Sequence, residues 1–259
     1  MLPPPFSTIV LDTNGPVAAL QLNRPERLNA LSTVMLREII EACAWLDTQA
    51  DVKVVVVSGA GRAFCAGFDL GDFTSSAQGQ SPRDTADLGR RAAEALSDVT
   101  ALTIAAVHGH CVGGGVVLTS ACDLRLAADT TRFSIPEVNL GIPLAWAGIP
   151  RLVRELGPAI TKDLVLTCRP FDAHEAHALR FVNRVVVADE LMAAASALAT
   201  ELAAQPGFAL RTTKQQVNAA MDEMIGTRRN ANDADSLVVA MSDPESRARA
   251  VDYLRSRSH

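Results

Sequence analysis

The chain of 259 residues is 48% hydrophobic and 20% charged, a composition typical of a globular protein and not of a disordered one. Its formal net charge of -5, with no basic run, argues against a protein that binds nucleic acid. The five cysteines include no C-x-x-C pair, so they predict neither a disulfide framework nor a zinc site and favour a reducing compartment.

The N-terminal residues predict no targeting segment, because they lack a basic stretch followed by a long apolar one. No uninterrupted apolar run in the sequence reaches membrane-spanning length. We therefore expect a cytoplasmic protein with no membrane partner.

The first third of the chain alternates between predicted strands and a helix. Two apolar stretches flank Asn14-Gly15, a pair typical of a β-hairpin turn. Ser32 is the expected N-cap of a helix in which hydrophobic residues recur at helical spacing. Residues 52–57 are too hydrophobic for an exposed edge strand, so we expect structure on both of their faces.

The remainder continues this alternation. We expect an amphipathic helix over 83–99, strands over 102–107, 123–127, 133–135 and 182–187, helices over 152–156, 161–167 and 173–179, and helices from 190 onward with breaks at 205–207 and 242–244. Repeated strand–turn–helix units favour a spiral α/β core. We expect that core over residues 1–200 and a C-terminal helical region over 201–259.

Two glycine-rich segments, residues 59–70 and 107–123, each follow an apolar run that we expect to form a buried strand. The second leads from Gly113-Gly114-Gly115 directly into an apolar helical pattern, which places its amides at a helix N-terminus. Such N–H groups, at the positive end of the helix dipole, attract a negative oxygen. A second N–H from the first segment would complete an oxyanion hole.

These segments, FCAGFDL at 64–70 and AAVHGHCVGGG at 105–115, resemble those of the enoyl-CoA hydratase/isomerase (crotonase) superfamily. The resemblance begins at NRPERLNAL (23–31), passes through FSIPEVNLG (133–141) and ends in a charged C-terminal helix. It implies an α/β fold, a crotonase-like spiral of ββα units with a C-terminal helical trimerisation region. It also implies a homotrimer or homohexamer.

The resemblance implies an acyl-CoA enzyme in which the backbone amides of Phe68 and Gly114 hold the thioester oxygen of an enolate. It also makes Glu137 the acid/base. Taken alone, the local sequence favours an exposed loop glutamate, and the resemblance reverses this interpretation. Its apolar neighbours Ile135, Pro136 and Val138 favour partial desolvation, which would raise the pKa of the carboxyl toward neutrality.

Coenzyme A would be bound as part of the substrate, with no separate cofactor and no metal. The resemblance assigns its binding to the following residues: Arg27, Leu28, Ala30, Ala66, Phe68, Asp69, Leu70 and Gly114. Arg27 fits either a phosphate ligand or a solvated surface charge. Arg247 or Arg249 from the last helix is a further candidate, acting across subunits.

The main departure from the family pattern is Val117, which stands where hydratases carry a second glutamate in GGGxE. Valine transfers no proton, so a site with Glu137 alone favours moving one proton between carbons, a 3-enoyl to 2-enoyl isomerisation. Hydration with a single carboxylate and a non-catalytic acyl-CoA binder are the alternatives.

A second departure lies eight residues beyond Glu137. Dienoyl isomerases and the aryl-CoA dehalogenase carry an aspartate there, whereas this chain has Ala145, so neither reaction is expected. The adjacent Trp146 lies in a region that is often glycine-rich in hydratases. It either reshapes the acyl pocket or packs in the core.

Overall fold

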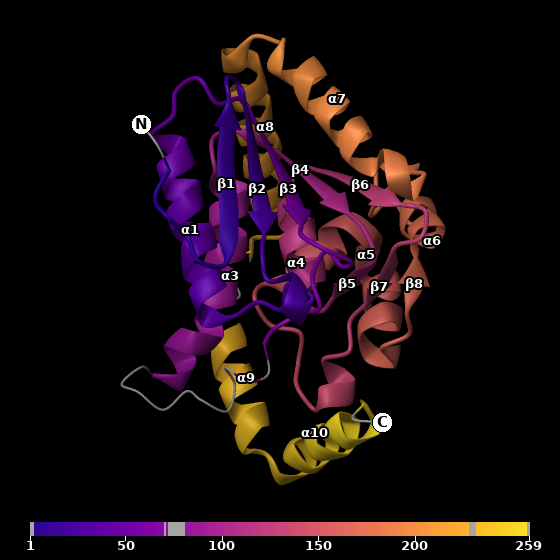
Figure 1. Ribbon diagram of the computed structural model, residues 1–259. Coiled ribbons are helices and arrows are strands. Elements are labelled where there is room, and N and C mark those ends of the chain that lie inside the picture. The colour runs from indigo at the N-terminus through magenta and orange to yellow at the C-terminus, as the bar shows by residue number, and fades with distance from the viewer. Residues whose placement is uncertain (1–2, 70, 72–80, 228–231, 258–259) are drawn as a thin grey trace.

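The computed structural model describes residues 3–69, 71, 81–227 and 232–257 (Figure 1). Its main sheet has the strand order β1-β2-β3-β4-β6-β9. These strands are β1 (Ile9–Asn14), β2 (Val17–Leu22), β3 (Val54–Gly59), β4 (Leu102–Val107), β6 (Leu124–Ala128) and β9 (Arg184–Val186). Only the β1–β2 hairpin is antiparallel within this described sheet, and the turn at Asn14-Gly15 is confirmed.

A second, three-stranded sheet has the order β5-β7-β8, with β5 (His110–Val112), β7 (Arg132–Ser134) and β8 (Phe171–Asp172). Phe133 and Phe171 stack with ring centroids 5.2 Å apart, and Phe181 meets Phe133 edge-on at 5.8 Å. No local pattern in the sequence predicts the short strands β5 and β8, because they form by pairing with partners far away in the chain.

Helices cover both faces of the main sheet, as Figure 1 shows. The helices of the described residues are α1 (Thr33–Asp47), α3 (Pro82–Asp98), α4 (Gly114–Ala121), α5 (Gly148–Thr167), α6 (Ala173–Ala178), α7 (Leu191–Ala203), α8 (Gly207–Met224), α9 (Asp233–Ser242) and α10 (Pro244–Arg257), of which α9 and α10 lie away from the sheet. Three short 3₁₀ helices are η1 (Pro25–Arg27), η2 (Val138–Leu140) and η3 (Ala188–Glu190).

All six residues of β3 are buried, which confirms that this strand has cover on both faces. Val54 and Val56 face α7, whereas Val55 and Val57 belong to the larger core that includes residues of α1, α3 and α4. Successive residues of a strand point to opposite faces, so a run of valines suits a strand with two apolar neighbours.

Helix caps match the local sequence. Ser32 Oγ accepts a hydrogen bond from the amide of Met35 at 3.1 Å, and Asp172 Oδ1 accepts one from Glu175 at 2.9 Å. Each side chain satisfies an N–H that has no partner within its own helix.

The prediction for residues 152–156 was too short. Helix α5 begins at Gly148, and Pro150 lies in its first turn, where no N–H is needed. The expected interruption is confirmed at Gly157, which has φ +75° and bends the helix. The breaks near 205–207 and 242–244 are also confirmed, by the ends of α7 and α9.

The expected boundary between residues 200 and 201 falls within α7, and the division into two domains stays a prediction.

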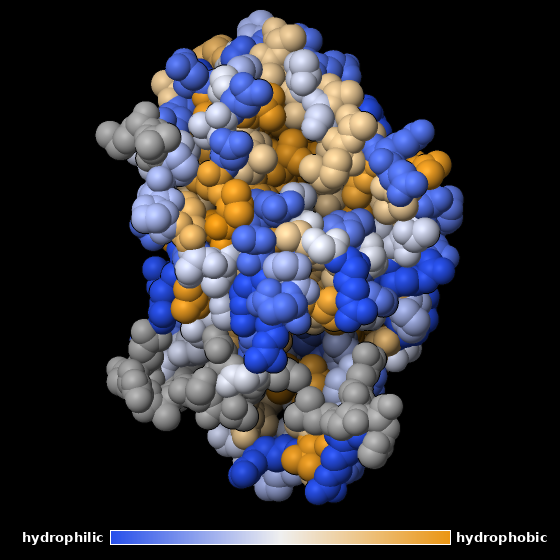
Figure 2. Space-filling view, viewed as in Figure 1, coloured by the Kyte–Doolittle hydropathy of each residue, from blue (hydrophilic) through white to orange (hydrophobic). Residues whose placement is uncertain are grey.

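In Figure 2, hydrophobic residues are more frequent over the sheet and α7 than over the middle of the molecule. Val187 and Met192 are among the exposed ones. The homotrimer or homohexamer stays a prediction. None of the helices in the described ranges is both long and apolar enough to span a membrane.

Helix α8 is attached to the sheet by a buried lysine. Lys214 Nζ lies 2.8 Å from Asp123 Oδ2 and donates to the carbonyl oxygen of Ala101 at 2.9 Å. Asp123 Oδ2 also accepts from the amide of Thr103 at 2.7 Å. These contacts join α8 to the start of β4 and the end of α4.

We predict that Lys214→Met lowers the free energy of unfolding by about 3 kcal/mol, because it leaves a largely buried carboxylate without its cation. Urea unfolding followed by circular dichroism measures this. Lys162→Met, at an exposed position of α5, is the control and should change stability by less than about 0.5 kcal/mol. Equal effects of the two substitutions would contradict the role given to Lys214.

Candidate active site

The segment that follows β3 is held by Asn29. Its fully buried side chain donates from Nδ2 to the carbonyl oxygens of Ala60 and Ala63, both at 2.8 Å. The Asn29 backbone is left-handed, with φ +55°, a conformation that asparagine adopts more readily than most residues. The local sequence indicates no role for Asn29, because its partners lie more than 30 residues away.

The two glycine-rich segments lie side by side. The amide of Cys65 donates to the carbonyl oxygen of His110 at 3.0 Å. Gly67 has φ +96°, and a Cβ there would lie 3.2 Å from the carbonyl oxygen of Val112. A side chain at this position would therefore be both strained and crowded. Glycine allows the first segment to pass close to β5.

Phe68 follows Gly67 in a short bridge with Leu31. The amide of Leu31 donates to Gly67 at 2.8 Å, and the amide of Asp69 donates to Leu31 at 3.0 Å. These bonds fix the backbone on both sides of Phe68.

Gly114 is the first residue of α4, so its N–H has no acceptor within that helix. Gly113 before it has φ +50°, and its amide donates to the carbonyl oxygen of Ser134 at 2.9 Å. Gly114 thus lies at the positive end of a completely buried helix.

Glu137 lies directly before η2, and its carboxylate lies against Gly113, where a Cβ would collide with Oε1. Its Oε2 is buried and has no hydrogen-bond partner among the described residues. Burial raises the pKa of the Glu137 carboxyl from 4.5 to about 7, and a hydrogen bond with its own backbone opposes this rise. The partial desolvation expected from its neighbours is confirmed.

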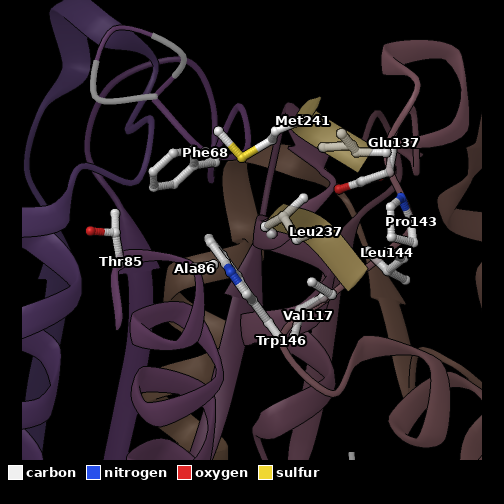
Figure 3. Close-up of a pocket in the computed structure, with 13 residues that line it drawn as sticks. Phe68, Thr85, Ala86, Val117, Glu137, Pro143, Leu144, Trp146, Leu237 and Met241 are labelled. Atoms are coloured by element: carbon white, nitrogen blue, oxygen red, sulfur yellow. The ribbon is translucent and has the colours of Figure 1, made fainter. Parts of the chain in front are cut away.

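The carboxylate points into a cavity of about 150 Å³ (Figure 3). The lining comes from the first glycine segment, α3, α4, the loop before α5 and α9: Phe68, Thr85, Ala86, Gly114, Val117, Glu137, Ile142, Pro143, Leu144, Ala145, Trp146, Leu237 and Met241. Among these described residues, Glu137 alone carries a titratable side chain. The structure therefore brings Phe68, Gly114 and Glu137 to one apolar cavity.

Val117 and Ala145, the two departures from the family pattern, both line this cavity and are buried. Val117 lies one turn into α4, with its Cγ2 close to Gly148. Neither position carries a titratable side chain.

The two segments assigned to coenzyme A, residues 27–30 and 66–69, pair through their backbones, and we call this pair of segments the ledge. The amide of Ala66 donates to the carbonyl oxygen of Leu28 at 2.9 Å. Arg24 Nη1 donates to the carbonyl oxygen of Ala30 at 2.7 Å and lies 2.9 Å from Asp69 Oδ2. Asp69 is therefore paired with Arg24, a contact that no local pattern in the sequence indicates.

Two further residues, Arg27 and Leu70, were assigned to the binding of coenzyme A. Arg27 is exposed at the end of η1. Leu70 lies outside the described residues. Binding of coenzyme A by this ledge stays a prediction.

Helix α9 of the same chain covers part of the cavity. Leu237 and Met241 of α9 line it, and Figure 3 shows both side chains between Phe68 and Glu137. Arg249 of α10 donates to Asn139 of η2 at 3.3 Å, just beyond Glu137. No local signal in the sequence indicates which helix face meets the site, so α9 was missed.

We predict that Glu137→Gln stabilises the protein at pH 8 more than at pH 5. A carboxyl whose pKa rises from 4.5 to about 7 on folding destabilises the folded state as pH increases through this range. Glutamine removes this loss, so the gain over the wild type should be about 2 to 3 kcal/mol larger at pH 8 than at pH 5. Urea unfolding at both pH values checks this, with Glu41→Gln on the exposed side of α1 as control. A gain independent of pH would contradict the assigned burial.

The family model described as enoyl-CoA hydratase/isomerase matches residues 12–257. The chain is 38% identical over 221 residues to a probable enoyl-CoA hydratase of Mycobacterium leprae, covering 85% of this chain and 84% of the relative. It is 39% identical over 185 residues to a peroxisomal Δ(3,5)-Δ(2,4)-dienoyl-CoA isomerase of Arabidopsis thaliana, covering 67% and 66%.

A solved structure of an enoyl-CoA hydratase/isomerase from Xanthobacter autotrophicus Py2 superposes with a TM-score of 0.87 at 29% identity. The match covers 98% of this chain and 94% of that one. The expected crotonase-like α/β fold is thereby confirmed. With a family match over nearly its whole length, the chain belongs to the enoyl-CoA hydratase/isomerase family of enzymes.

Proposed function

We propose that this enzyme isomerises 3-enoyl-CoA esters to 2-enoyl-CoA esters, with Glu137 as its single proton carrier. The observation that carries the proposal is the cavity lining, in which Glu137 is the one titratable side chain of the described residues. Val117 lines the same cavity, and it stands where hydratases of the family carry a second glutamate. Moving a proton from one carbon to another within one substrate needs one acid/base side chain. Adding water is better catalysed by two carboxylates, which orient the water molecule from both sides.

The reaction begins when the Glu137 carboxylate removes a proton from C2 of the ester. The electron pair of that C–H bond moves onto the thioester oxygen, and a dienolate forms. The backbone amides of Phe68 and Gly114 donate to this oxygen, and each donor lowers the barrier by about 3 kcal/mol. Protonated Glu137 then delivers the proton to C4, which leaves the double bond between C2 and C3.

The pKa of about 7 suits both steps. A carrier that titrates near the working pH is present as a carboxylate when it must accept a proton and is acidic enough to return it. The apolar surroundings also strengthen the hydrogen bonds to the thioester oxygen, because little solvent screens them.

The ester would be held through its coenzyme A portion by Arg27, Leu28, Ala30, Ala66, Asp69 and Leu70, and through its carbonyl group by Phe68 and Gly114. The ledge formed by the pairing of Ala66 with Leu28 supports this placement, since backbone groups there can follow an extended ligand.

Hydration of a 2-enoyl-CoA is the second candidate. The similarity to a probable hydratase favours it. In that reaction Glu137 would activate a water molecule with no second carboxylate to orient it. A non-catalytic acyl-CoA binder is less well supported, because Glu137 keeps a buried oxygen directed at the cavity.

We predict that Glu137→Gln lowers kcat for isomerisation by roughly 10³-fold, because it removes the general acid/base and keeps the side-chain volume. Chromatography of the products from matched 2-enoyl-CoA and 3-enoyl-CoA esters measures both candidate reactions. Binding of the ester should survive, and Glu41→Gln serves as the matched control. Retained turnover in Glu137→Gln would eliminate this residue as the proton carrier.

We also predict that kcat/KM for the 3-enoyl ester rises with pH and levels off above an apparent pKa of about 7. Only the deprotonated carboxylate can accept the C2 proton, so activity is lost as pH falls through that value. Initial rates between pH 5 and 9 test this. A profile that is flat down to pH 5 would contradict the raised pKa of Glu137.

A further inference from the structure

Trp146 occupies an unusual place in the loop before α5. Its backbone is left-handed, with φ +62°, and that of Ala147 is left-handed too, with φ +54°. The amide of Ala147 donates to Asp233 Oδ2 at 2.9 Å, at the start of α9. A bulky residue takes this conformation only when its surroundings hold it there. Here the turn directs the indole ring into the space between α3 and α4.

Two glycines make room for that ring. A Cβ at Gly89 of α3 or at Gly114 of α4 would collide with the six-membered ring of Trp146. Glycine inside a helix is destabilising relative to alanine, so Gly89 in the middle of α3 has a packing reason. The indole ring fills a slot that is open only because both helices lack a side chain at the point of contact.

The ring also forms a wall of the cavity next to the carbonyl-binding end. Its neighbour Phe68 meets it edge-on, with centroids 5.7 Å apart at 87°. Figure 3 shows the indole below Phe68 and beside Val117, on the far side of the cavity from Pro143. An acyl group whose carbonyl oxygen lies at Phe68 and Gly114 therefore extends along the indole.

The cavity that remains is small. Its volume is about 150 Å³, and an apolar cavity of roughly that volume accommodates a benzene-sized guest. A longer acyl chain needs the space that the indole fills between α3 and α4.

We propose that Trp146 is the specificity-determining residue of this enzyme, that it restricts the acyl group to compact chains of about six carbons or fewer, and that Gly89 is the residue that permits its position. The proposal rests on the proposed function, because it places the acyl group in the cavity of Glu137. It goes beyond that function by naming the class of acyl group.

The test measures binding of saturated acyl-CoA esters, which have no double bond to move and so report on the pocket independently of turnover. Isothermal titration calorimetry with butanoyl-, hexanoyl-, decanoyl- and dodecanoyl-CoA gives the ratio of affinities. We expect the wild type to bind hexanoyl-CoA at least tenfold more tightly than dodecanoyl-CoA. Trp146→Ala should lower this ratio at least tenfold, and Trp146→Leu should lower it less.

The matched control is Trp45→Phe, since Trp45 is equally buried but lies in α1, outside the cavity lining. It should leave the ratio unchanged. An unchanged ratio in folded Trp146→Ala or Trp146→Leu would overturn the proposal and leave Trp146 as core packing.

A second measurement needs no change at Trp146. The chain has two tryptophans, so Trp45→Phe leaves Trp146 as the single tryptophan, whose emission is excited selectively over that of the one tyrosine. Hexanoyl-CoA should shift or quench its emission, whereas free coenzyme A should not. No response to hexanoyl-CoA at saturation would overturn the contact between the acyl group and the indole.

These readouts separate two failures. If the affinity ratio changes as expected but no 3-enoyl ester is isomerised, the proposed reaction is wrong and the role of Trp146 stands. If a 3-enoyl ester is isomerised but the affinity ratio is unchanged in the Trp146 variants, the proposed reaction stands and the role of Trp146 is wrong. Absence of binding by every ester would overturn both.

Discussion

The close approach of Glu137 to Gly113 is the constraint on which the site depends. Because the carboxylate occupies the space where a Cβ would lie, the residue before α4 must be glycine, and its positive φ of +50° turns the chain into that helix. The same turn leaves the amide of Gly114 at the helix start, beside the proposed acid/base. One steric requirement thus links the proposed proton carrier to a candidate donor for the thioester oxygen.

Placing a carboxylate in an apolar cavity has an energetic cost, and the fold supports it from several directions. Asn29 holds the first glycine segment, the second is paired with β7, and α9 covers the cavity with Leu237 and Met241. Each of these contacts excludes solvent or fixes backbone. The burial that raises the pKa of Glu137 is therefore a property of the whole assembly of loops and helices and not of η2 alone.

Much of this arrangement can be predicted from the sequence, because the residue types at turns and helix caps determine the local backbone conformation. A hairpin turn, a helix cap and a close approach of two backbones each require particular residue types at particular positions. Examples are Asn14-Gly15, Ser32 and the glycines beside Phe68 and Gly114. What escaped prediction depends on partners distant in the chain. Asn29 bonds across more than 30 residues, Lys214 across more than 100, and α9 reaches the cavity through side chains whose facing no local pattern indicates. The seating of Trp146 against Gly89 belongs to this second group.

In the proposed reaction, one buried carboxylate carries a single proton from C2 to C4. A 3-enoyl-CoA ester deuterated at C2, incubated in ordinary water, tests this directly when the product is analysed by mass spectrometry and nuclear magnetic resonance. Because the Glu137 oxygen is shielded from solvent, we predict a 2-enoyl product of unchanged carbon skeleton with deuterium at C4 in part of the molecules. A product that has gained water, or an isomerised product with no label at C4, would contradict it.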